Sequence, residues 1–421
     1  MNLSESSNKY EIYYLRRNPF RAIEIAPVYD RDAIDEVLTK FCETIRQEEL
    51  EFIYNNFIRP ALDEGVTINL WIEGEVGQGK SALLIKLWND LRKRKDVLAI
   101  YAPIESGLSS EGFYKGWIKE LGMDFFEDLA YRLVRKLLVK DLEKFLIAES
   151  EVKEEYAKKL REILLEDHRI LRQIFQPGQT PEIKELSYLD KNRIIEEFGY
   201  WLITIEGVTT RPLISGSGRR KPILAQFLEN PARGFKELFD LYPPRYALST
   251  FRDIIILAHE AGYKMTFIFI DQLDFQWVRA GWSRSKKDKI IREFRNFVSQ
   301  ILGKASIAVT TYPYLTAEFR SDADLMSALP MTPQRLCTLS ALDDGKAREL
   351  IATYLKSERT KEEVPPLVPF TTDAIDEMNR QVRGNVRGLL GLAYDILSKA
   401  ADEKVTKIGA EYVRSYLGAR E

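Results

Sequence analysis

Histidine and cysteine are almost absent from this sequence, which has two of each in 421 residues. Zinc sites usually need several His or Cys side chains close together, and catalytic triads usually need a histidine, so the sequence has too few of these residues to favour either class of site. The two cysteines, Cys42 and Cys337, lie far apart in the sequence, which excludes a disulfide framework and fits a reducing compartment. We therefore expect a cytoplasmic protein.

Long apolar runs and a strong net charge are missing as well. No apolar stretch approaches the ~20 residues that cross a bilayer, and the first residues, MNLSESSNKYEIYY, are too polar for a signal peptide. Lysine and arginine number 62 against 64 aspartates and glutamates, which gives a net charge of −2. The chain is therefore not a basic coat for nucleic acid, and any such contact needs a local patch. We expect no membrane partner.

The most informative stretch runs from Ile68 to Leu84 and has the pattern of a buried strand, a glycine-rich loop and a helix. The loop matches the phosphate-binding pattern G-x-x-x-x-G-K-[ST] at every fixed position. Its residues are Gly74, Glu75, Val76, Gly77, Gln78, Gly79, Lys80 and Ser81, followed by Ala82 in the helix. A glycine-rich turn without a ligand is the alternative interpretation.

Each part of this loop has a chemical role in binding a triphosphate. Glycines let the backbone adopt positive φ and bring its N–H groups against phosphate oxygens. The following helix directs the positive end of its dipole at the same anion. We expect residues 74–82 to bind ATP, with Lys80 reaching the β- and γ-phosphates and Ser81 ligating Mg²⁺.

A second candidate metal ligand follows another apolar strand. Residues 265–270 form an apolar run that ends in Asp271, as expected of a central parallel strand. The carboxyl edge of such a sheet is where α/β proteins bind their ligands. We expect Asp271 to hold Mg²⁺ directly or through water, and the alternative is an aspartate that only caps the end of a strand.

Three further apolar segments, residues 97–101, 306–311 and 336–339, predict the rest of a sheet. The expected fold is α/β: a P-loop NTPase with a parallel five-stranded sheet, a helical insertion and a C-terminal all-helical lid domain. The expected domains are 1–60, an N-terminal extension with adenine-pocket helices; 61–106 and 246–340, the ATPase core; 107–245, the helical insertion; and 341–421, the lid.

The order of these motifs resembles that of an AAA+ P-loop ATPase of the replication-initiator, transposition-regulator and STAND-like type. Asp271 matches the Walker B aspartate, and Thr310, or the adjacent Thr311, matches the sensor-1 position. Gly384-Asn385-Val386-Arg387 is similar to the family's G-D-x-R motif, which implies that Arg387 reaches the γ-phosphate. Such a charge-assisted bond is lost after hydrolysis, as a switch requires. The alternative is a surface arginine beside a helix N-terminus.

The resemblance extends to the N-terminal segment and covers about residues 18–105 and 250–417. Asn18-Pro19-Phe20, followed by Val28-Tyr29-Asp30-Arg31, looks like the segment that lines the adenine pocket in this clade. The resemblance also implies self-association, because AAA+ enzymes often complete their site with an arginine from a neighbouring subunit. Arg320 is the better-placed candidate for that role, and Arg335 is the other.

Two departures from the family pattern bear on the activity. Gln272 stands where the catalytic family usually has glutamate, and an amide cannot take a proton from water, although it can orient one. Asp274 could serve as a displaced base, so we expect an ATPase of low turnover. The sequence also ends at Glu421 without the winged-helix domain of replication initiators, which favours a stand-alone regulator or one component of a complex.

Two short basic patches are candidates for contact with DNA or RNA. They consist of Arg284, Lys286, Lys287 and Lys289, and of Arg219, Arg220 and Lys221. Trp277 and Trp282 flank the first patch, and aromatic rings beside basic residues can stack on bases. The alternative is that both patches are ordinary solvated surfaces.

These observations predict a Mg²⁺- and ATP-binding ATPase that couples nucleotide binding and slow hydrolysis to assembly on, or remodelling of, a nucleic-acid or protein partner. The alternative is a STAND-like signalling or defence switch that uses ATP largely as a structural ligand. A GTPase would carry an N-K-x-D motif and an ABC transporter ATPase an L-S-G-G-Q motif, and the sequence contains neither.

Overall fold

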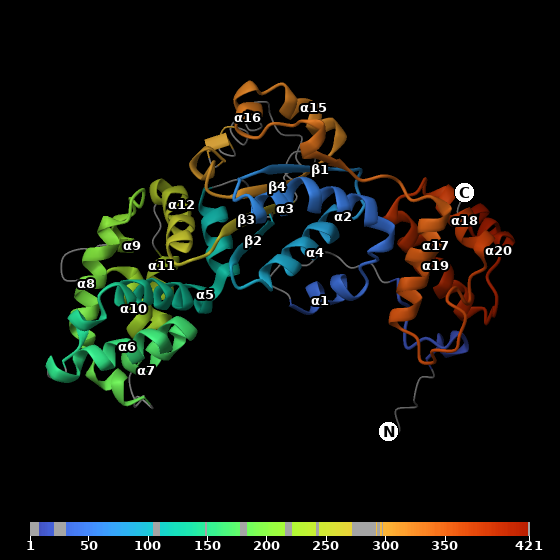
Figure 1. The fold of residues 1–421 in the computed structure, drawn as a ribbon. Helices are drawn as coiled ribbons and strands as arrows, with labels where there is room; N and C mark the ends of the chain where they lie inside the picture. Colours follow the sequence, from blue (N-terminus) through green and yellow to red (C-terminus); the bar gives the residue numbers. More distant parts are fainter. Residues whose placement is uncertain are drawn as a thin grey trace.

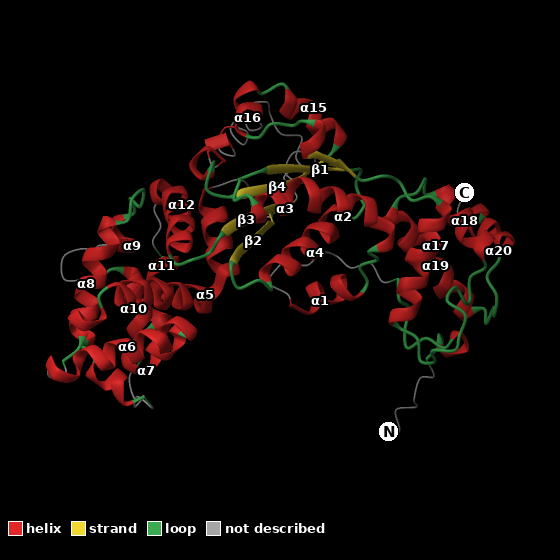
Figure 2. Ribbon diagram, in the orientation of Figure 1, coloured by secondary structure: helices red, strands yellow, loops and turns green. Residues whose placement is uncertain are grey.

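The computed structural model describes residues 8–20, 31–103, 110–147, 150–176, 183–214, 221–240, 244–271, 292, 295–296 and 298–419. Within these ranges a five-stranded, all-parallel sheet lies between two groups of helices, one built from the middle of the chain and one from its C-terminal part (Figure 1). Figure 2 shows the strands confined to this centre. The predicted fold class is confirmed: α/β, with a parallel five-stranded sheet, a helical insertion and a helical lid.

The sheet has the strand order β2-β3-β4-β1-β5. Its strands are β1 (Asn69–Glu73), β2 (Val97–Pro103), β3 (Met265–Asp271), β4 (Ser306–Thr311) and β5 (Leu336–Thr338). Every residue of β3 and β4 is buried, as expected of central strands in a parallel sheet covered on both faces. Because all five strands are parallel, the segments that follow them emerge at one edge, where α/β proteins bind ligands.

One face of the sheet is covered by the helix that follows β1 and by the helices that precede it. Leu83, Leu84, Leu87 and Leu91 recur at helical spacing in α4 (Lys80–Arg92) and are buried against the sheet. The preceding elements are α1 (Arg31–Thr39), α2 (Gln47–Ile53), a π-helical turn (Tyr54–Ile58) and α3 (Arg59–Asp63). Phe57 and Phe267 of β3 meet edge to face at 5.5 Å, which joins this N-terminal layer to the sheet.

The helical insertion packs on the other side of the sheet. Its elements are α5 (Ser110–Lys140), α6 (Ser150–Glu166), α7 (Arg172–Phe175), α8 (Lys191–Thr204), α9 (Arg211–Ile214), α10 (Ile223–Glu229) and α11 (Pro231–Phe239), followed by α12 (Pro244–Glu260). Gly122, at φ 73°, interrupts the long α5. Apolar side chains of α5, such as Leu133, share one continuous core with strand residues, such as Ile268 and Ile307. Two short helices, α15 (Pro313–Arg320) and α16 (Ala323–Ala328), connect β4 to β5.

The lid consists of α17 (Asp344–Ser357), α18 (Thr372–Gln381), α19 (Val386–Asp402) and α20 (Ala410–Gly418). Its core also includes apolar side chains from the N-terminal segment 8–20, which runs beside these helices (Figure 1). None of the described helices combines the length and the apolarity needed to cross a bilayer.

The Asn18-Pro19-Phe20 motif lies in this lid core. Asn18 Nδ2 donates to Tyr394 O at 3.0 Å, and the Phe20 ring stacks on Tyr354 with ring centres 6.1 Å apart. Phe20 is only 1% exposed, so its ring packs against protein, whereas the family resemblance implied that it lines a nucleotide pocket. Residues 28–30 of the same motif lie outside the described residues, and the side chain of Arg31 is not described.

Candidate nucleotide-binding site

The glycine-rich loop joins β1 to α4, as the sequence pattern predicts. Gly77 and Gly79 have φ of 83° and 88°, in the left-handed region that other residues rarely adopt. A Cβ on Gly77 would lie 2.7 Å from Asn385 Oδ1 and 2.8 Å from Arg387 Cβ, so the lid also requires glycine here. Since α4 begins at Lys80, the N–H groups of its first turn, which cannot bond within the helix, lie at the end of the loop. This cradle suits an anion.

The ammonium group of Lys80 lies inside the loop. Its Nζ donates to Gly74 O at 2.6 Å and to Glu75 O at 3.1 Å, and it lies 4.3 Å from the centre of the Tyr312 ring. The side chain is 9% exposed, so a cation is held in the loop against the end of β4. A phosphate oxygen carries charge and is therefore a stronger acceptor than a carbonyl oxygen. The lysine can thus exchange its present partners for a phosphate.

The end of β3 places the predicted acid beside the predicted polar strand end. Asp271 is 1% exposed, and its Oδ1 accepts a hydrogen bond from Thr310 Oγ1 of β4 at 2.8 Å. Its Oδ2 accepts from Tyr101 Oη of β2 at 2.5 Å. A buried carboxylate needs such donors. Asp271 and Thr310 were predicted at this edge from the sequence, whereas Tyr101 was not, because an aromatic residue in a strand usually belongs to the core.

The side chains at this edge of the sheet offer the oxygen ligands that Mg²⁺ prefers. Among the described residues, no three His, Cys, Asp or Glu side chains converge. Magnesium bound with a nucleotide needs only one or two protein ligands, because phosphate oxygens and waters fill its other positions. Ser81 on the first turn of α4 offers a hydroxyl, and Asp271 offers a carboxylate. These are the two ligands that the sequence predicts.

A half-buried acid lies behind the same edge, where the insertion meets α4 and β2. Burial raises the pKa of Glu120 in α5 to about 8, although the Trp88 indole, the Tyr101 backbone and Arg92 oppose this shift. Glu120 Oε2 is fully buried and has no hydrogen-bond partner among the described residues. The carboxyl group is therefore neutral at pH 7.

The lid reaches the loop through the N-terminus of α19. The backbone N–H of Arg387 donates to Gly77 O at 2.9 Å, and Asn385 Nδ2 donates to Val76 O at 2.6 Å. The Arg387 guanidinium is exposed and makes no hydrogen bond or ion pair with the part of the chain that the structure describes. Gly384 has φ 71°, and a Cβ there would lie 2.7 Å from Leu342 N and O. The 384–387 motif therefore packs directly on the phosphate loop.

Arg46, just ahead of α2, contacts the loop from the other side and was missed in the sequence. It is 3% exposed, and its Nη2 donates to Gln78 O at 2.8 Å. Its Nη1 donates to Ser340 O at 3.1 Å and to Glu49 Oε1 at 2.9 Å. Ser340 lies between β5 and α17, so one guanidinium connects the N-terminal helices, the loop and the segment leading to the lid.

The two candidate arginines for action in a neighbouring subunit differ in their contacts. Arg320 ends α15 and is exposed, with no hydrogen bond or ion pair to any described residue. Arg335 Nη1 donates to Asn69 Oδ1 at 2.7 Å, at the start of β1 and therefore at the opposite edge of the sheet from the loop. Arg320 is thus the freer of the two.

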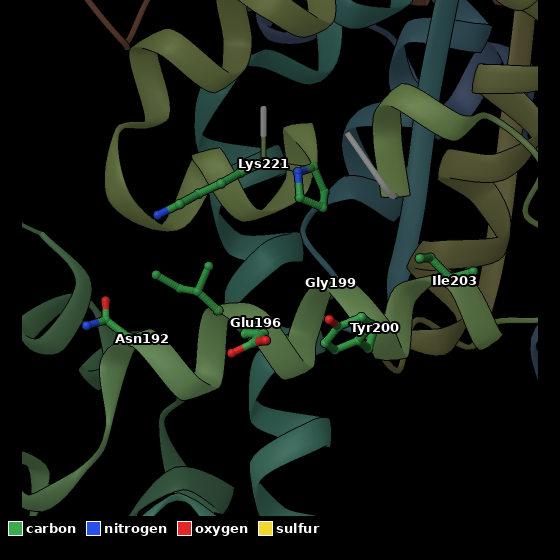
Figure 3. A pocket seen from close by; sticks show the side chains of 8 residues that line it. Asn192, Glu196, Gly199, Tyr200, Ile203 and Lys221 are labelled. Carbon is green, nitrogen blue, oxygen red and sulfur yellow. The ribbon is translucent and has the colours of Figure 1, made fainter. Parts of the chain in front are cut away.

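Several predicted site residues lie outside the described residues. They are Gln272 and Asp274 of the site, and Arg219, Arg220, Arg284, Lys286, Lys287 and Lys289 of the basic patches. Lys221 is described, and its Nζ pairs with Glu229 Oε2 at 2.6 Å. This lysine also lines a hollow of about 330 Å³ between α8 and Pro222, beside the exposed Tyr200 and Ile203 (Figure 3).

Comparison with known proteins gives only distant structural similarities. No protein-family model and no curated protein matches the chain. The structure of the Aeropyrum pernix ORC1 protein in complex with DNA aligns with 91% of this chain and 69% of its own, at 12% identity and a TM-score of 0.41. A structure of Drosophila ORC bound to DNA aligns with 99% of this chain and 67% of its own, at 11% identity and a TM-score of 0.37. Similarity at this level does not distinguish one function from another.

Proposed function

We propose that this chain is an AAA+-type ATPase that binds Mg²⁺ and ATP at residues 74–82. It couples this binding, and a slow hydrolysis, to assembly on or remodelling of a nucleic-acid or protein partner. The observation that carries the proposal is the meeting of three features at one edge of the sheet: a left-handed glycine loop holding Lys80, the Asp271–Thr310 pair, and the docked N-terminus of α19. In this proposal the three features have different chemical roles: binding the phosphates, holding Mg²⁺ and sensing the γ-phosphate.

In this proposal the loop backbone and Lys80 bind the phosphates, and Ser81 and Asp271 hold Mg²⁺. Bound Mg²⁺ neutralises negative charge on the phosphates. Thr310 and Tyr101 fix the orientation of the Asp271 carboxylate through its two oxygens. The rigid edge of the sheet thus presents one hydroxyl and one carboxylate to the metal before nucleotide arrives.

Arg387 supplies the sensitivity to the last phosphate. Its guanidinium is exposed beside the loop and has no partner among the described residues, so it can bond to a γ-phosphate without breaking another contact. The bond exists with ATP and is lost with ADP. The two nucleotides therefore differ in affinity for the docked lid, and such a difference is what shifts a conformational equilibrium.

Slow turnover follows from the residue after Asp271. Gln272 can orient a water molecule but cannot accept its proton, so hydrolysis depends on another base, for which Asp274 is the nearest acid in the sequence. We also propose self-association in which Arg320, rather than Arg335, reaches the site of a neighbouring copy. The expected division at residues 60, 106, 245 and 340 would then separate the unit that binds nucleotide from the units that respond to it.

The direct test of the site is Lys80→Ala, with Lys93→Ala as the matched control. Lys93 lies just beyond the C-terminal end of the same helix and is exposed, so its loss leaves the loop untouched. Titration with a fluorescent ATP analogue in Mg²⁺ should show at least about a hundredfold weaker binding for Lys80→Ala, because several charge-assisted bonds to phosphate are lost. Lys93→Ala should bind as the wild type does. Unchanged affinity of Lys80→Ala would place the nucleotide elsewhere.

The alternative function is a STAND-like switch that holds ATP as a structural ligand, and the Asp271-Gln272 pair favours it. Single-turnover hydrolysis by the wild type and by Gln272→Glu separates the two functions. If the chain is a remodelling ATPase, the wild-type protein should already hydrolyse ATP, and Gln272→Glu should give only a modest gain in rate. A wild type that retains ATP, together with a large gain for Gln272→Glu, would identify the switch.

A further inference from the structure

Three consecutive carbonyl groups of the phosphate loop, those of residues 76–78, accept hydrogen bonds from outside the loop. In order, the donors are Asn385 Nδ2 at 2.6 Å, the Arg387 backbone N–H at 2.9 Å and Arg46 Nη2 at 2.8 Å. Two of the donors belong to the lid, and the third lies ahead of α2. We call these three contacts the loop clamp.

The loop clamp sets the direction in which the loop's N–H groups point. A trans peptide is planar, so holding the carbonyl of one residue on one side directs the N–H of the next residue to the other side. The bonds to Val76 O and Gln78 O thus turn the N–H groups of Gly77 and Gly79 away from the lid and from Arg46. Within the described chain neither of these N–H groups has an acceptor. Two directed amides of this kind form a concave site for an anion.

Asn385 has two roles, one for each end of its amide group. Its Oδ1 accepts from Gly388 N at 2.9 Å and so caps α19, while its Nδ2 donates to the carbonyl of Val76. An ionised aspartate could still cap the helix, but it has no hydrogen to donate and would place a negative charge against a carbonyl oxygen. The amide is therefore the chemical link between helix α19 and the loop.

Arg46 reaches the loop and the lid's connecting segment with one buried group. Its bonds to Gln78 O and Ser340 O tie the loop to the segment between β5 and α17, and Glu49 balances its charge. In that same segment, Leu339 N donates to Glu73 O at 2.7 Å, immediately before the loop. A shift of the lid would therefore pull on the loop at Val76 through Asn385 and at Gln78 through Arg46.

We propose that Asn385 and Arg46 are positioning residues for the nucleotide. They hold the loop backbone in the conformation that binds an anion, and they do so only while the lid is docked. Nucleotide binding and lid docking consequently stabilise one another, since coupling between two equilibria is reciprocal. The inference rests on the proposed nucleotide site, and it adds that the lid controls affinity through main-chain geometry as well as through Arg387.

The test uses Asn385→Ser and Asn385→Asp, both of which retain a helix-capping oxygen. Asn230 provides the matched control, because it caps α11 in the insertion by accepting from Arg233 N at 3.0 Å and has no role at the loop. The measurements are Mg²⁺-ATP affinity, melting temperature, and amide hydrogen exchange in α19 with and without ATP.

The expected affinity loss is about three- to tenfold for Asn385→Ser, the usual effect of one lost hydrogen bond. Asn385→Asp should lose about tenfold more, because its charge repels the phosphates. The same changes at Asn230 should leave the ATP affinity within about twofold of the wild type, because a distant, independent site affects binding by only a few tenths of a kcal/mol. ATP should slow exchange in α19 of the wild type but not of Asn385→Asp, a result that a purely structural role would not give.

Arg46→Lys provides a second, independent arm. It retains the charge that balances the buried Glu49 but cannot reach both carbonyls at once, so a several-fold loss of affinity is expected. If the Asn385 and Arg46 variants bind ATP as the wild type does while Lys80→Ala does not, the inference is wrong and the proposed nucleotide site stands. If the wild type itself shows no saturable ATP binding, both are overturned.

Discussion

The helical insertion and the lid join the same sheet by different means. Side chains of the insertion form one apolar core with strand residues, among them Leu133, Ile268 and Ile307. The lid has its own core, which contains no residue of any strand. Near the loop it meets the sheet domain through the hydrogen bonds of Asn385 and Arg387 to the loop, and it also packs on Cys42 and Ile45 just ahead of α2. The comparison predicts that the insertion is fixed to the sheet, whereas the lid is attached to it less firmly.

This difference has a physical reason. Separating two apolar surfaces exposes both to water at about 25 cal/mol for each Å², so a continuous core opens only when the domain unfolds. A few polar contacts can be exchanged for water at small net cost, because each is worth only about 1 kcal/mol. A ligand that changes lid contacts by a few kcal/mol can therefore move the lid without disturbing the insertion.

The largest expected effect tests whether the insertion and the sheet form one unit. Phe126 of α5 is fully buried, with its ring centre 5.6 Å from that of Phe227. Phe126→Ala should lower the free energy of unfolding by about 3–5 kcal/mol, because it leaves a cavity in the shared core. Amide exchange in β3 should accelerate together with exchange in the insertion.

The lid offers the counterpart variant. Ile396 of α19 is fully buried in the lid core, and Ile396→Ala should cost about 2–5 kcal/mol within the lid. Exchange in α17–α20 should accelerate while exchange in β3 stays at the wild-type rate. Equal acceleration in β3 for both variants would show that the lid is as firmly attached as the insertion.

A smaller effect should appear as pH dependence at the junction of the insertion with the sheet. The folded pKa of Glu120 is about 8, and an unfolded glutamate titrates near 4.3. Between these values the unfolded chain releases a proton that the folded protein keeps, so stability falls as pH rises through this window. Glu120→Gln should remove that fall and stabilise the protein by on the order of a few kcal/mol at pH 8.

Chemical denaturation at a series of pH values measures the effect. Glu154→Gln is the matched control, because Glu154 is an exposed residue of α6 in the same insertion. Its substitution should leave the slope of stability against pH unchanged. An identical slope for the wild type and Glu120→Gln would mean that the carboxyl of Glu120 is ionised in the folded protein.

The strands and the loop could be predicted from the sequence because their signals are local. The β4 segment 306–311 was predicted with the bounds that the structure has, and the glycine pattern located residues 74–81. Strand ends then brought Asp271 and Thr310 to one edge by parallel geometry alone. Tyr101 and Arg46 could not be found in this way. Arg46 contacts backbone carbonyls 32 and 294 positions away. Every residue carries a backbone carbonyl, so residue types do not show which one an arginine will contact.

The N-terminal motif shows a different limit of sequence reasoning. Asn18 and Phe20 were assigned to an adenine pocket by resemblance, yet the structure places both in the lid core. Their burial explains the residue types, because an aromatic ring fills the core and the amide satisfies the carbonyl of Tyr394. Packing thus accounts for the residue types of this motif, and its contact with an adenine ring stays a prediction.

The most direct test of the account is amide hydrogen exchange of the wild-type protein with and without saturating Mg²⁺-ATP. We predict slower exchange in two places that are far apart in sequence, the loop at residues 74–81 and the start of α19 at residues 386–390, with no change in α6–α10 of the insertion. Protection confined to another part of the chain, or protection of the insertion equal to that of the lid, would contradict it.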